Sequence, residues 1–513
     1  MAGGGHNGLV AATYLGRAGL SVLVLERLAH VGGAAVSTQP FRGHEARVSP
    51  YSSLVSLIPD QLVEDLGLDL RLASRTTSSY APTFRDGQPG GLLVERHDEA
   101  STRASFEAAT GGTDEYDAWR ELHADLSDLA HAVAPTLLAP LPVERTIRDR
   151  VDTGIWRDFV TNPLGATIEE RFTHEAVRGI VAGHALVGTF ASLQDPSLAQ
   201  NRCFLYRAIG NGTGEARVPV GGMGAVTDAL ARAAREAGVE ILTSVGVSAI
   251  RGGDSSAEVQ FHDGMSSHTV GARFALANVA PWVLQILLGE PEDRETKPQG
   301  AQLKIDLLVD RLPTLRSGID PTVALAGTMH LGSEYAQLEK AYAEAAAGQV
   351  PSVVPGLLDC PSLTDPSVVG SSGEGRHTLT FLGLHTPAAL FDGDDRAAVK
   401  ERAVAGALAA INEHLVEPIE SCLARDAHGN PCLEARTPQD VEADLAMPGG
   451  HIYHGGLDWP WASNRARLDT PAQQWGVQTD VGSVMVCGSG ARRGGGDSGL
   501  GGHNAAQAVL AHR

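Results

Sequence analysis

The chain is poor in cysteine and has no paired cysteine motif. Its 513 residues contain five cysteines, an odd set without any C-x-x-C spacing. This pattern disfavours a disulfide framework, a zinc site and a redox-active dithiol, and it suits a reducing compartment. We therefore predict a cytoplasmic protein. Cys487 ends an apolar strand candidate, so we interpret it as a core thiol in preference to an attachment point for a prosthetic group.

Long apolar runs and basic stripes are also missing. No uncharged apolar stretch reaches the ~18 residues of a membrane-spanning helix, so we predict no integral membrane segment, while peripheral contact with a membrane stays open. The net charge of −21 and the lack of a basic stripe argue against nucleic acid as a partner. No G-x-S-x-G elbow stands between a strand and a helix, which disfavours a Ser-His-Asp hydrolase. The oligomeric state is left open by the composition.

The clearest positive feature starts at the third residue. Residues 3–8 read GGGHNG, which fits G-x-G-x-x-G, and they are followed by an apolar helix candidate and by a β-branched strand ending in Glu26. This order is the dinucleotide-binding fingerprint. In that fingerprint, Gly3 permits a tight turn, Gly5 lets the backbone approach a pyrophosphate, and Gly8 lets helix and strand pack closely. Glu26 stands near the position of the acid that accepts hydrogen bonds from a ribose.

One part of the fingerprint is shortened. Only Met1 and Ala2 precede Gly3, whereas this fold normally begins with a central strand of about five apolar residues. Without that strand, we expect its two neighbouring strands to keep unpaired backbone groups. We attribute the shortening to a start codon placed inside the first strand, with a genuine truncation as the alternative.

The residues after Glu26 make the interpretation more specific. Arg27 follows the acid directly, and the pair Gly32 and Gly33 follows shortly after. An acid-arginine pair with this glycine pair resembles the FAD-binding amino-oxidase and phytoene-desaturase superfamily. The resemblance implies FAD rather than NAD as the cofactor, with the glycine pair approaching its diphosphate.

Nucleotide-binding sequence returns further along the chain. Residues 218–224 read VPVGGMG before an Ala-rich helix candidate, and a buried strand candidate at 274–281 contains Asn278. The GGMG loop resembles the phytoene-dehydrogenase-like branch of the superfamily. In that branch, a residue matching Val247 meets the adenine through its backbone, and Asn278 stands at the expected cofactor edge.

The end of the chain carries a second glycine signature. Residues 484–506 read as a strand, a glycine loop and a closing helix, whose N-terminus would stabilise negative charge on a reduced flavin. Together with the opening segment, it resembles the FAD-dependent phytoene dehydrogenase-like family, in the branch that includes pyridine nucleotide-disulphide oxidoreductase domain-containing protein 2. Asp497 departs from the family pattern, which has an apolar residue there. Fingerprint and resemblance together predict these cofactor-binding residues: Gly3, Gly5, His6, Asn7, Gly8, Glu26, Arg27, Gly32, Gly33, Val247, Asn278, Gly488, Gly495, Asp497, Ser498, Gly499 and Leu500.

The order of these motifs predicts an α/β fold with a doubly wound, Rossmann-like FAD-binding domain of the glutathione-reductase type and an interleaved α+β substrate domain. We expect the FAD-binding domain at residues 1–75, 210–299 and 426–513, and the substrate domain at 76–209 and 300–425. Within the substrate domain, the patterns predict strands near 83–84, 92–94, 303–309 and 378–384, a helix near 394–413, and a surface loop at 350–366.

A histidine pair is the best polar cluster outside the cofactor motifs. Residues 449–455 read GGHIYHG, which resembles a loop near the flavin in the same branch. His454 is our candidate catalytic residue, as a cavity wall or a proton shuttle, and a structural loop histidine is the alternative. His451 and His454 have no third ligand in view, so we predict no metal site.

These features predict an FAD-dependent oxidoreductase that removes hydrogens from a small apolar organic substrate, as a dehydrogenase or desaturase with flavin as hydride acceptor. A flavin amine oxidase is one alternative, although its aromatic cage is harder to build with 5% aromatic residues. A flavin-stabilised interaction protein without catalysis is another, because of the shortened first strand. Isomerisation on reduced flavin also stays open.

Overall fold

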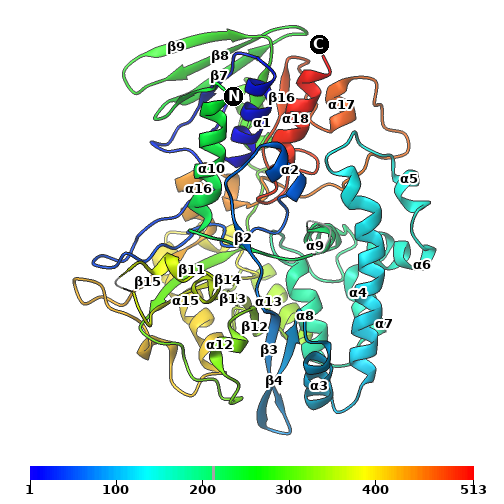
Figure 1. The fold of residues 1–513 in the computed structure, drawn as a ribbon, viewed down its shortest axis with the longest axis vertical. Helices are drawn as coiled ribbons and strands as arrows, with labels where there is room; N and C mark the ends of the chain where they lie inside the picture. Colours follow the sequence, from blue (N-terminus) through cyan, green and yellow to red (C-terminus); the bar gives the residue numbers. More distant parts are fainter. Residues whose placement is uncertain (211–213, 372, 513) are drawn as a thin grey trace.

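A computed structural model describes residues 1–210, 214–371 and 373–512. Both chain termini lie in the upper half of the molecule in Figure 1, beside α1 and α18, whereas the lower half contains the larger sheet. The upper half is built mainly from the first, middle and last parts of the sequence, as the blue, green and red segments show. The first, middle and last parts of the chain therefore come together in one half of the molecule.

The first sheet consists of four short parallel strands: β1 (Leu23–Leu25), β6 (Glu240–Leu242), β10 (Ala275–Ala277) and β16 (Val484–Val486). β1 pairs with β6, β10 pairs with β16, and Ala2 joins the two pairs by bridging Leu25 and Ala277. The Ala2 amide donates to the Leu276 carbonyl at 2.9 Å, and the Gly3 amide donates to the Leu25 carbonyl at 2.8 Å. The expectation of unpaired neighbours is therefore wrong, because residues 1–3 occupy the central place between them.

Three helices pack together on this sheet: α1 (His6–Arg17), α10 (Met223–Glu236) and α18 (Leu500–Leu510). α1 and α18 approach so closely that a Cβ on Gly502 would lie 1.9 Å from the carbonyl oxygen of Asn7. An antiparallel meander extends from the upper end in Figure 1: β7 (Gly246–Gly252), β8 (Ala257–His262) and β9 (Ser267–Ala272). This arrangement confirms the predicted α/β FAD-binding fold class.

The second sheet has seven strands in the order β15-β11-β14-β13-β12-β3-β4. Their bounds are β3 (Thr77–Arg85), β4 (Gln88–Glu95), β11 (Leu303–Val309), β12 (Thr328–Leu331), β13 (Gly356–Asp359), β14 (His377–Gly383) and β15 (Leu433–Arg436). All neighbours are antiparallel except β12 and β3, which run parallel. The sheet thus unites two chain segments that are far apart in sequence, while the domain boundaries stay predictions.

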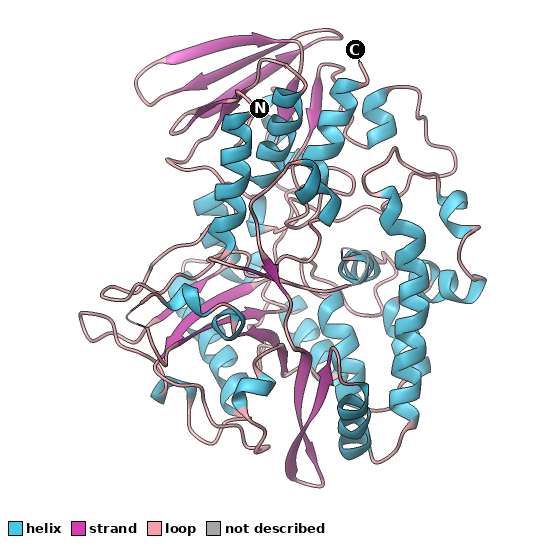
Figure 2. Ribbon diagram, viewed as in Figure 1, coloured by secondary structure: helices cyan, strands magenta, loops and turns pink. Residues whose placement is uncertain are grey.

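Helices surround this second sheet, and Figure 2 shows several of them grouped on its right side. The longer ones are α3 (Glu99–Thr110), α4 (Asp114–Val133), α7 (Leu164–Arg171), α8 (Glu175–Ala185), α9 (Ala199–Ile209), α13 (Tyr335–Ala346) and α15 (Arg396–Asn412). The shorter α-helices and strands are α2 (Asp60–Asp65), α5 (Glu144–Arg148), α6 (Thr153–Trp156), α11 (Pro281–Leu287), α12 (Pro321–Ala324), α14 (Pro361–Thr364), α16 (Pro438–Leu445), α17 (Pro471–Trp475), β2 (Leu72–Ala73) and β5 (Val218–Pro219).

The prediction of a surface loop at residues 350–366 is wrong. This stretch contains β13, whose four residues are all buried between β12 and β14. Pro355 and Pro361 flank the strand. Prolines are excluded from the interior of a central strand but are allowed just outside it, so they mark the ends of this strand and not a loop.

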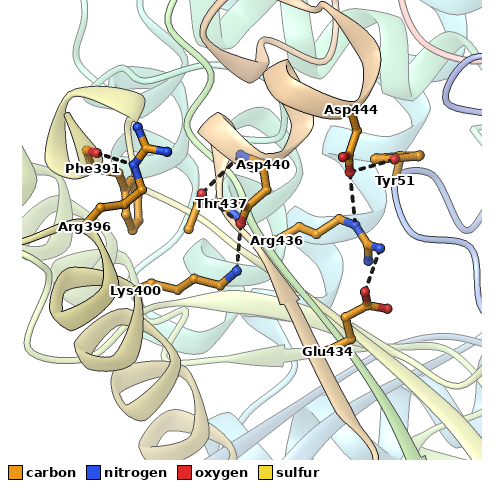
Figure 3. Close-up of polar contacts among 9 residues, drawn as sticks. All are labelled: Tyr51, Phe391, Arg396, Lys400, Glu434, Arg436, Thr437, Asp440 and Asp444. Atoms are coloured by element: carbon orange, nitrogen blue, oxygen red, sulfur yellow. Dashed lines mark hydrogen bonds and ion pairs between the residues drawn. The ribbon is translucent and has the colours of Figure 1, made fainter. Parts of the chain in front are cut away.

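Polar contacts tie α16 to both neighbouring layers (Figure 3). Lys400 of α15 pairs with Asp440 at 2.8 Å, and Arg436 at the end of β15 pairs with Asp444 at 3.6 Å. The Tyr51 hydroxyl donates to the same Asp444 carboxylate at 3.0 Å. The loop that contains Tyr51 follows the nucleotide-binding segment, so α16 links that segment to the second sheet.

Candidate functional site

The opening turn has a geometry that requires glycine. Gly3 has φ +101°, and a Cβ there would lie 2.8 Å from the carbonyl oxygen of Asn278. A Cβ on Gly8 would lie 2.5 Å from the Gly3 carbonyl oxygen. In the described part of the chain, no side chain caps the start of α1. The turn therefore presents backbone donors and the positive end of a helix dipole at one place.

Glu26 lies beside this turn and is buried. Its carboxylate accepts hydrogen bonds from the amides of Gly4 at 2.7 Å and Leu28 at 2.8 Å. The chain therefore brings the acid to the glycine turn, as the fingerprint predicts. The two contacts also hold the turn against the end of β1 before any ligand binds.

The glycine pair completes this face of the turn. The amide of Gly32 donates to the Gly4 carbonyl at 2.9 Å, which brings the pair against the start of α1. A Cβ on Gly33 would have only the Cα of Gly5 within 4 Å, at 3.3 Å. The backbones of Gly5 and Gly33 therefore face each other with no side chain between them, which lets a pyrophosphate bind close to both.

The closing glycine loop meets the same site from the other side. A Cβ on Gly488 would lie 3.1 Å from Oδ1 of Asn278 and 3.4 Å from Nδ1 of His454. Gly499 has φ +71° and is the N-terminal cap of α18. Nε2 of His6 lies 3.2 Å from the carbonyl oxygen of Gly496, and this hydrogen bond connects the closing loop to α1. The structure thus unites the opening turn, Asn278, His454 and the closing loop.

His454 has an unusual environment. Its backbone lies in the left-handed region at φ +64°, and Nδ1 is buried without a hydrogen-bond partner in the described part of the chain. Burial, together with the neighbouring His6 and His451, lowers the pKa of His454 to about 3. The imidazole is therefore neutral at physiological pH. Since a general base works best with a pKa near the operating pH, this favours a wall of the cavity over a proton shuttle.

Asp497, the departure from the family pattern, is placed beside the opening turn. It accepts a hydrogen bond from the hydroxyl of Ser52. Burial raises the pKa of Asp497, and burial lowers the pKa of His6, its charge partner. Loss of water therefore favours the uncharged forms of both groups.

The other predicted cofactor residues have varied surroundings. Ser498, Leu500 and Gly495 are buried in the closing loop or at the start of α18. Val247 lies on β7, just after a segment in which the Val245 amide donates to the Glu26 carbonyl at 2.9 Å. Arg27 is exposed and donates to the Asp444 carbonyl at 2.7 Å, so its side chain points to α16. Which of the predicted residues contact the cofactor stays a prediction.

An apolar wall beside the closing loop was not predicted from sequence. Tyr453 packs against it, since a Cβ on Gly496 would lie 3.8 Å from the tyrosine ring, and a Cβ on Gly188 would lie 2.0 Å from it. The ring is partly buried and packs against a buried cluster of Leu57, Cys203, Tyr206 and Leu457; these five residues are here called the Tyr453 wall. These residues come from three separate segments, around 57, 203–206 and 453–457, so no local spacing could connect all of them.

Two further properties of the chain concern its cysteines and metals. All five cysteines are free and buried, and burial raises the pKa of Cys487 to about 12. A thiol with this pKa stays protonated, which fits a core thiol. Among the described residues, no group of three or more His, Cys, Asp or Glu side chains could hold a metal ion. The described ranges also contain no helix long and apolar enough to cross a membrane.

The arrangement fits FAD. The start of α1 with its facing glycine pair suits a pyrophosphate, Glu26 suits a ribose, and the N-terminus of α18 suits the electron-rich end of a flavin. Fold and site together define an FAD-dependent oxidoreductase.

Comparison with known proteins gives the family. Residues 8–310, more than half of the chain, match the flavin-containing amine oxidoreductases, and the protein belongs to this family. An uncharacterized protein of Mycobacterium tuberculosis is 46% identical over 524 residues, covering 100% of this chain and 96% of its own.

Two more distant similarities cover the whole fold. Pyridine nucleotide-disulfide oxidoreductase domain-containing protein 2 of Rattus norvegicus is 27% identical over 554 residues, covering 99% of this chain and 92% of its own. The structure of putrescine oxidase with bound putrescine has a TM-score of 0.58 at 16% identity, covering 100% of this chain and 97% of that one. The predicted resemblance to the rat protein's group is confirmed, while the phytoene dehydrogenase-like assignment stays a prediction.

Proposed function

We propose that the protein oxidises an organic amine at the carbon next to nitrogen, with FAD as the hydride acceptor. The family match and the fold shared with putrescine oxidase support this proposal. The observation that carries it is the Tyr453 wall, which brings Tyr206 and Tyr453 together against the closing glycine loop. From the sequence we expect an aromatic cage around the amine to be hard to build, and the Tyr453 wall contributes two tyrosines towards one.

The proposed reaction needs little from the side chains beyond position. The substrate loses a hydride from carbon and a proton from nitrogen, which gives an imine that water can hydrolyse. When bound, FAD accepts the hydride. The Tyr453 wall would exclude water and hold the substrate carbon, and neutral His454 would add a hydrogen-bonding group without placing a charge beside the reacting carbon.

Dehydrogenation of an apolar carbon skeleton is the second candidate. Leu57, Cys203 and Leu457 give the Tyr453 wall a mainly apolar surface, and burial raises the pKa of Asp497, an acid within the closing loop. A neutral Asp497 would not attract an ammonium group. This surface would accept a hydrocarbon as well as an uncharged amine.

Anaerobic flavin bleaching separates the two candidates. The holoenzyme would be mixed without oxygen with straight-chain primary amines, and separately with alkenes of matched length. Loss of the visible absorbance of oxidised flavin with amines alone supports amine oxidation. Bleaching with alkenes alone supports the second candidate, and bleaching by neither class contradicts both. Tyr453→Leu should slow bleaching and leave flavin content unchanged, with Tyr342→Leu, a tyrosine outside the wall, as the matched control.

A further inference from the structure

A cluster of two arginines and two histidines lies where α8 and α9 meet the second sheet. It consists of Arg75, His184, Arg207 and His330, here called the cationic cluster. Arg207 stands on α9, four residues after Cys203, which belongs to the wall. Residues four apart on a helix share one face, so α9 presents an apolar group and then a cation along the same face. The charge of Arg207 also acts on the phenol of Tyr453.

Arg207 is partly exposed, and in the described residues Asp359 acts on its charge without a direct contact. In the described part of the chain, its guanidinium forms no hydrogen bond or ion pair with the protein. The carboxylate that could neutralise it is already engaged: Asp359 pairs with Arg75 at 2.7 Å and accepts from the Thr328 hydroxyl at 2.7 Å. Two guanidinium groups therefore share one carboxylate, and one positive charge is left over. Because Arg207 is partly exposed and no carboxylate of the described residues contacts its guanidinium, this charge is free to pair with an anionic ligand that supplies the opposite charge.

His330 supplies a second and independent observation. Its side chain is 2% exposed, and neither ring nitrogen has a hydrogen-bond partner in the described residues. The ring meets His184 edge-to-face, with centroids 5.0 Å apart, and a Cβ on Gly183 would lie 3.3 Å from its Nδ1. A neutral imidazole carries one N–H donor, and a buried donor without an acceptor is costly. Burial and the charge of Arg207 lower the pKa of His330 to about 3, which keeps it neutral.

We infer that the cationic cluster binds a carboxylate at the far end of the substrate, with Arg207 as its charge partner and His330 as a hydrogen-bond donor. One excess positive charge matches a monoanion, which favours a carboxylate over a phosphate dianion. The substrate is then amphiphilic: an apolar part lies against the Tyr453 wall and a carboxylate lies against Arg207. This inference rests on the proposed function, because it describes the other end of the same substrate.

The test measures binding without turnover. Straight-chain alkanoates from butanoate to dodecanoate, and the primary amide of each, would be titrated into the holoenzyme by calorimetry. We expect at least one alkanoate to bind about tenfold or more tightly than its own amide, because only the carboxylate forms charge-assisted hydrogen bonds with Arg207. If every alkanoate binds no better than its amide, the inference is wrong.

Two variants assign the preference to Arg207. Arg207→Met should bind alkanoate and amide equally, and Arg207→Lys should recover part of the difference, because the ammonium restores the charge but not the planar fork. The control is Arg202→Met on the same helix, whose guanidinium donates to the Ser197 carbonyl at 2.9 Å. An unchanged alkanoate preference in Arg207→Met would overturn the inference. If Arg207→Met loses its flavin, the comparison of alkanoates with amides in the wild type still decides.

The binding test for the carboxylate site can succeed or fail independently of the bleaching test for amine oxidation. Alkanoate binding that depends on Arg207, without bleaching by any amine, would retain the carboxylate site and reject amine oxidation. Amine bleaching with equal binding of alkanoates and amides would do the reverse.

Discussion

Glu26 illustrates how one side chain can serve both the free protein and the cofactor complex. It accepts hydrogen bonds from the Gly4 and Leu28 amides, and it lies where the fingerprint places the ribose. Glu26→Ala removes both contacts. We expect it to weaken FAD binding by about 1–3 kcal/mol, the range for lost charge-assisted hydrogen bonds. Flavin content per chain after dialysis is the measurement.

The flavin-free form of the same variant gives a further check. Glu26→Ala should also melt at a lower temperature without flavin, since the Gly4 amide loses its acceptor. Full flavin retention in Glu26→Ala would show that the acid does not contact the cofactor. Glu64→Ala, an exposed glutamate on α2, is the matched control and should change neither quantity.

The lowered pKa of a buried histidine predicts how the stability of the protein changes at acid pH. His414 is 5% exposed and stacks on Phe84 at 5.6 Å. Burial and the charge of Arg316 lower the pKa of His414 to about 4, from 6.5. A depressed pKa means that the unfolded chain binds a proton before the folded chain does. The contribution of His414 to stability is therefore complete above pH 6.5 and is lost as the pH falls towards 4.

His414→Phe removes this proton linkage while keeping an aromatic ring. Each pH unit between the two pKa values costs the wild type up to about 1.4 kcal/mol that the variant does not lose. Urea unfolding at about pH 7 and pH 5 should show the variant gaining on the wild type by roughly 1–2 kcal/mol at the lower pH. Parallel pH dependences would mean that His414 is protonated in the folded protein. His428→Phe, at an exposed histidine, should leave the pH dependence unchanged.

At the scale of elements, the start of α18 is the most sensitive point of the closing loop. Gly499 adopts φ +71°, and a Cβ there would lie 3.1 Å from Leu62 and 3.2 Å from Val10. Gly499→Val would combine a disfavoured backbone conformation with crowding against α1 and α2. We expect loss of flavin binding, measured as flavin per chain after gel filtration.

A matched glycine shows whether this loss is specific. Gly393 is exposed, and a Cβ there would have nothing within 4 Å. Gly393→Val should keep its flavin. Equal flavin content in the two variants would mean that the N-terminus of α18 is not part of the cofactor site.

Elements with a strong local pattern were predictable. Strands expected at 303–309 and 378–384 are observed as β11 and β14, and the Ala-rich helix near 394–413 is α15. The stretch at 350–366 failed because β13 has only four residues and lies between prolines, which favour a loop by local rules. Its place in the sheet comes from the strands on both sides and not from its own sequence.

At the scale of the whole molecule, the two halves of the site differ in how far sequence could predict them. The cofactor half is made of continuous motifs, so residues 3–33 and 484–506 identified it directly. The substrate half depends on tertiary contacts: Tyr453 meets Gly188, and His184 meets His330 across the space between α8 and β12. No spacing along the chain links these residues, and the roles we propose for them rest on burial and on hydrogen-bond partners that the described residues do not supply.

The shortened first strand shows a second difference between the sequence prediction and the structure. Sequence rules asked for about five residues, yet backbone hydrogen bonds of Ala2 and Gly3 alone connect β1 with β10. Each of the four parallel strands is itself only three residues long. The short central segment therefore pairs with strands that are themselves short.

The most direct test of the account is the identity of the flavin. The purified protein would be denatured, the precipitate removed, and the flavin in the supernatant identified and counted per chain. We expect FAD, released without covalent attachment, at a level approaching one per chain in the wild type. A chain that releases NAD, retains flavin in the precipitate, or carries no flavin after refolding with excess FAD would contradict the central claim.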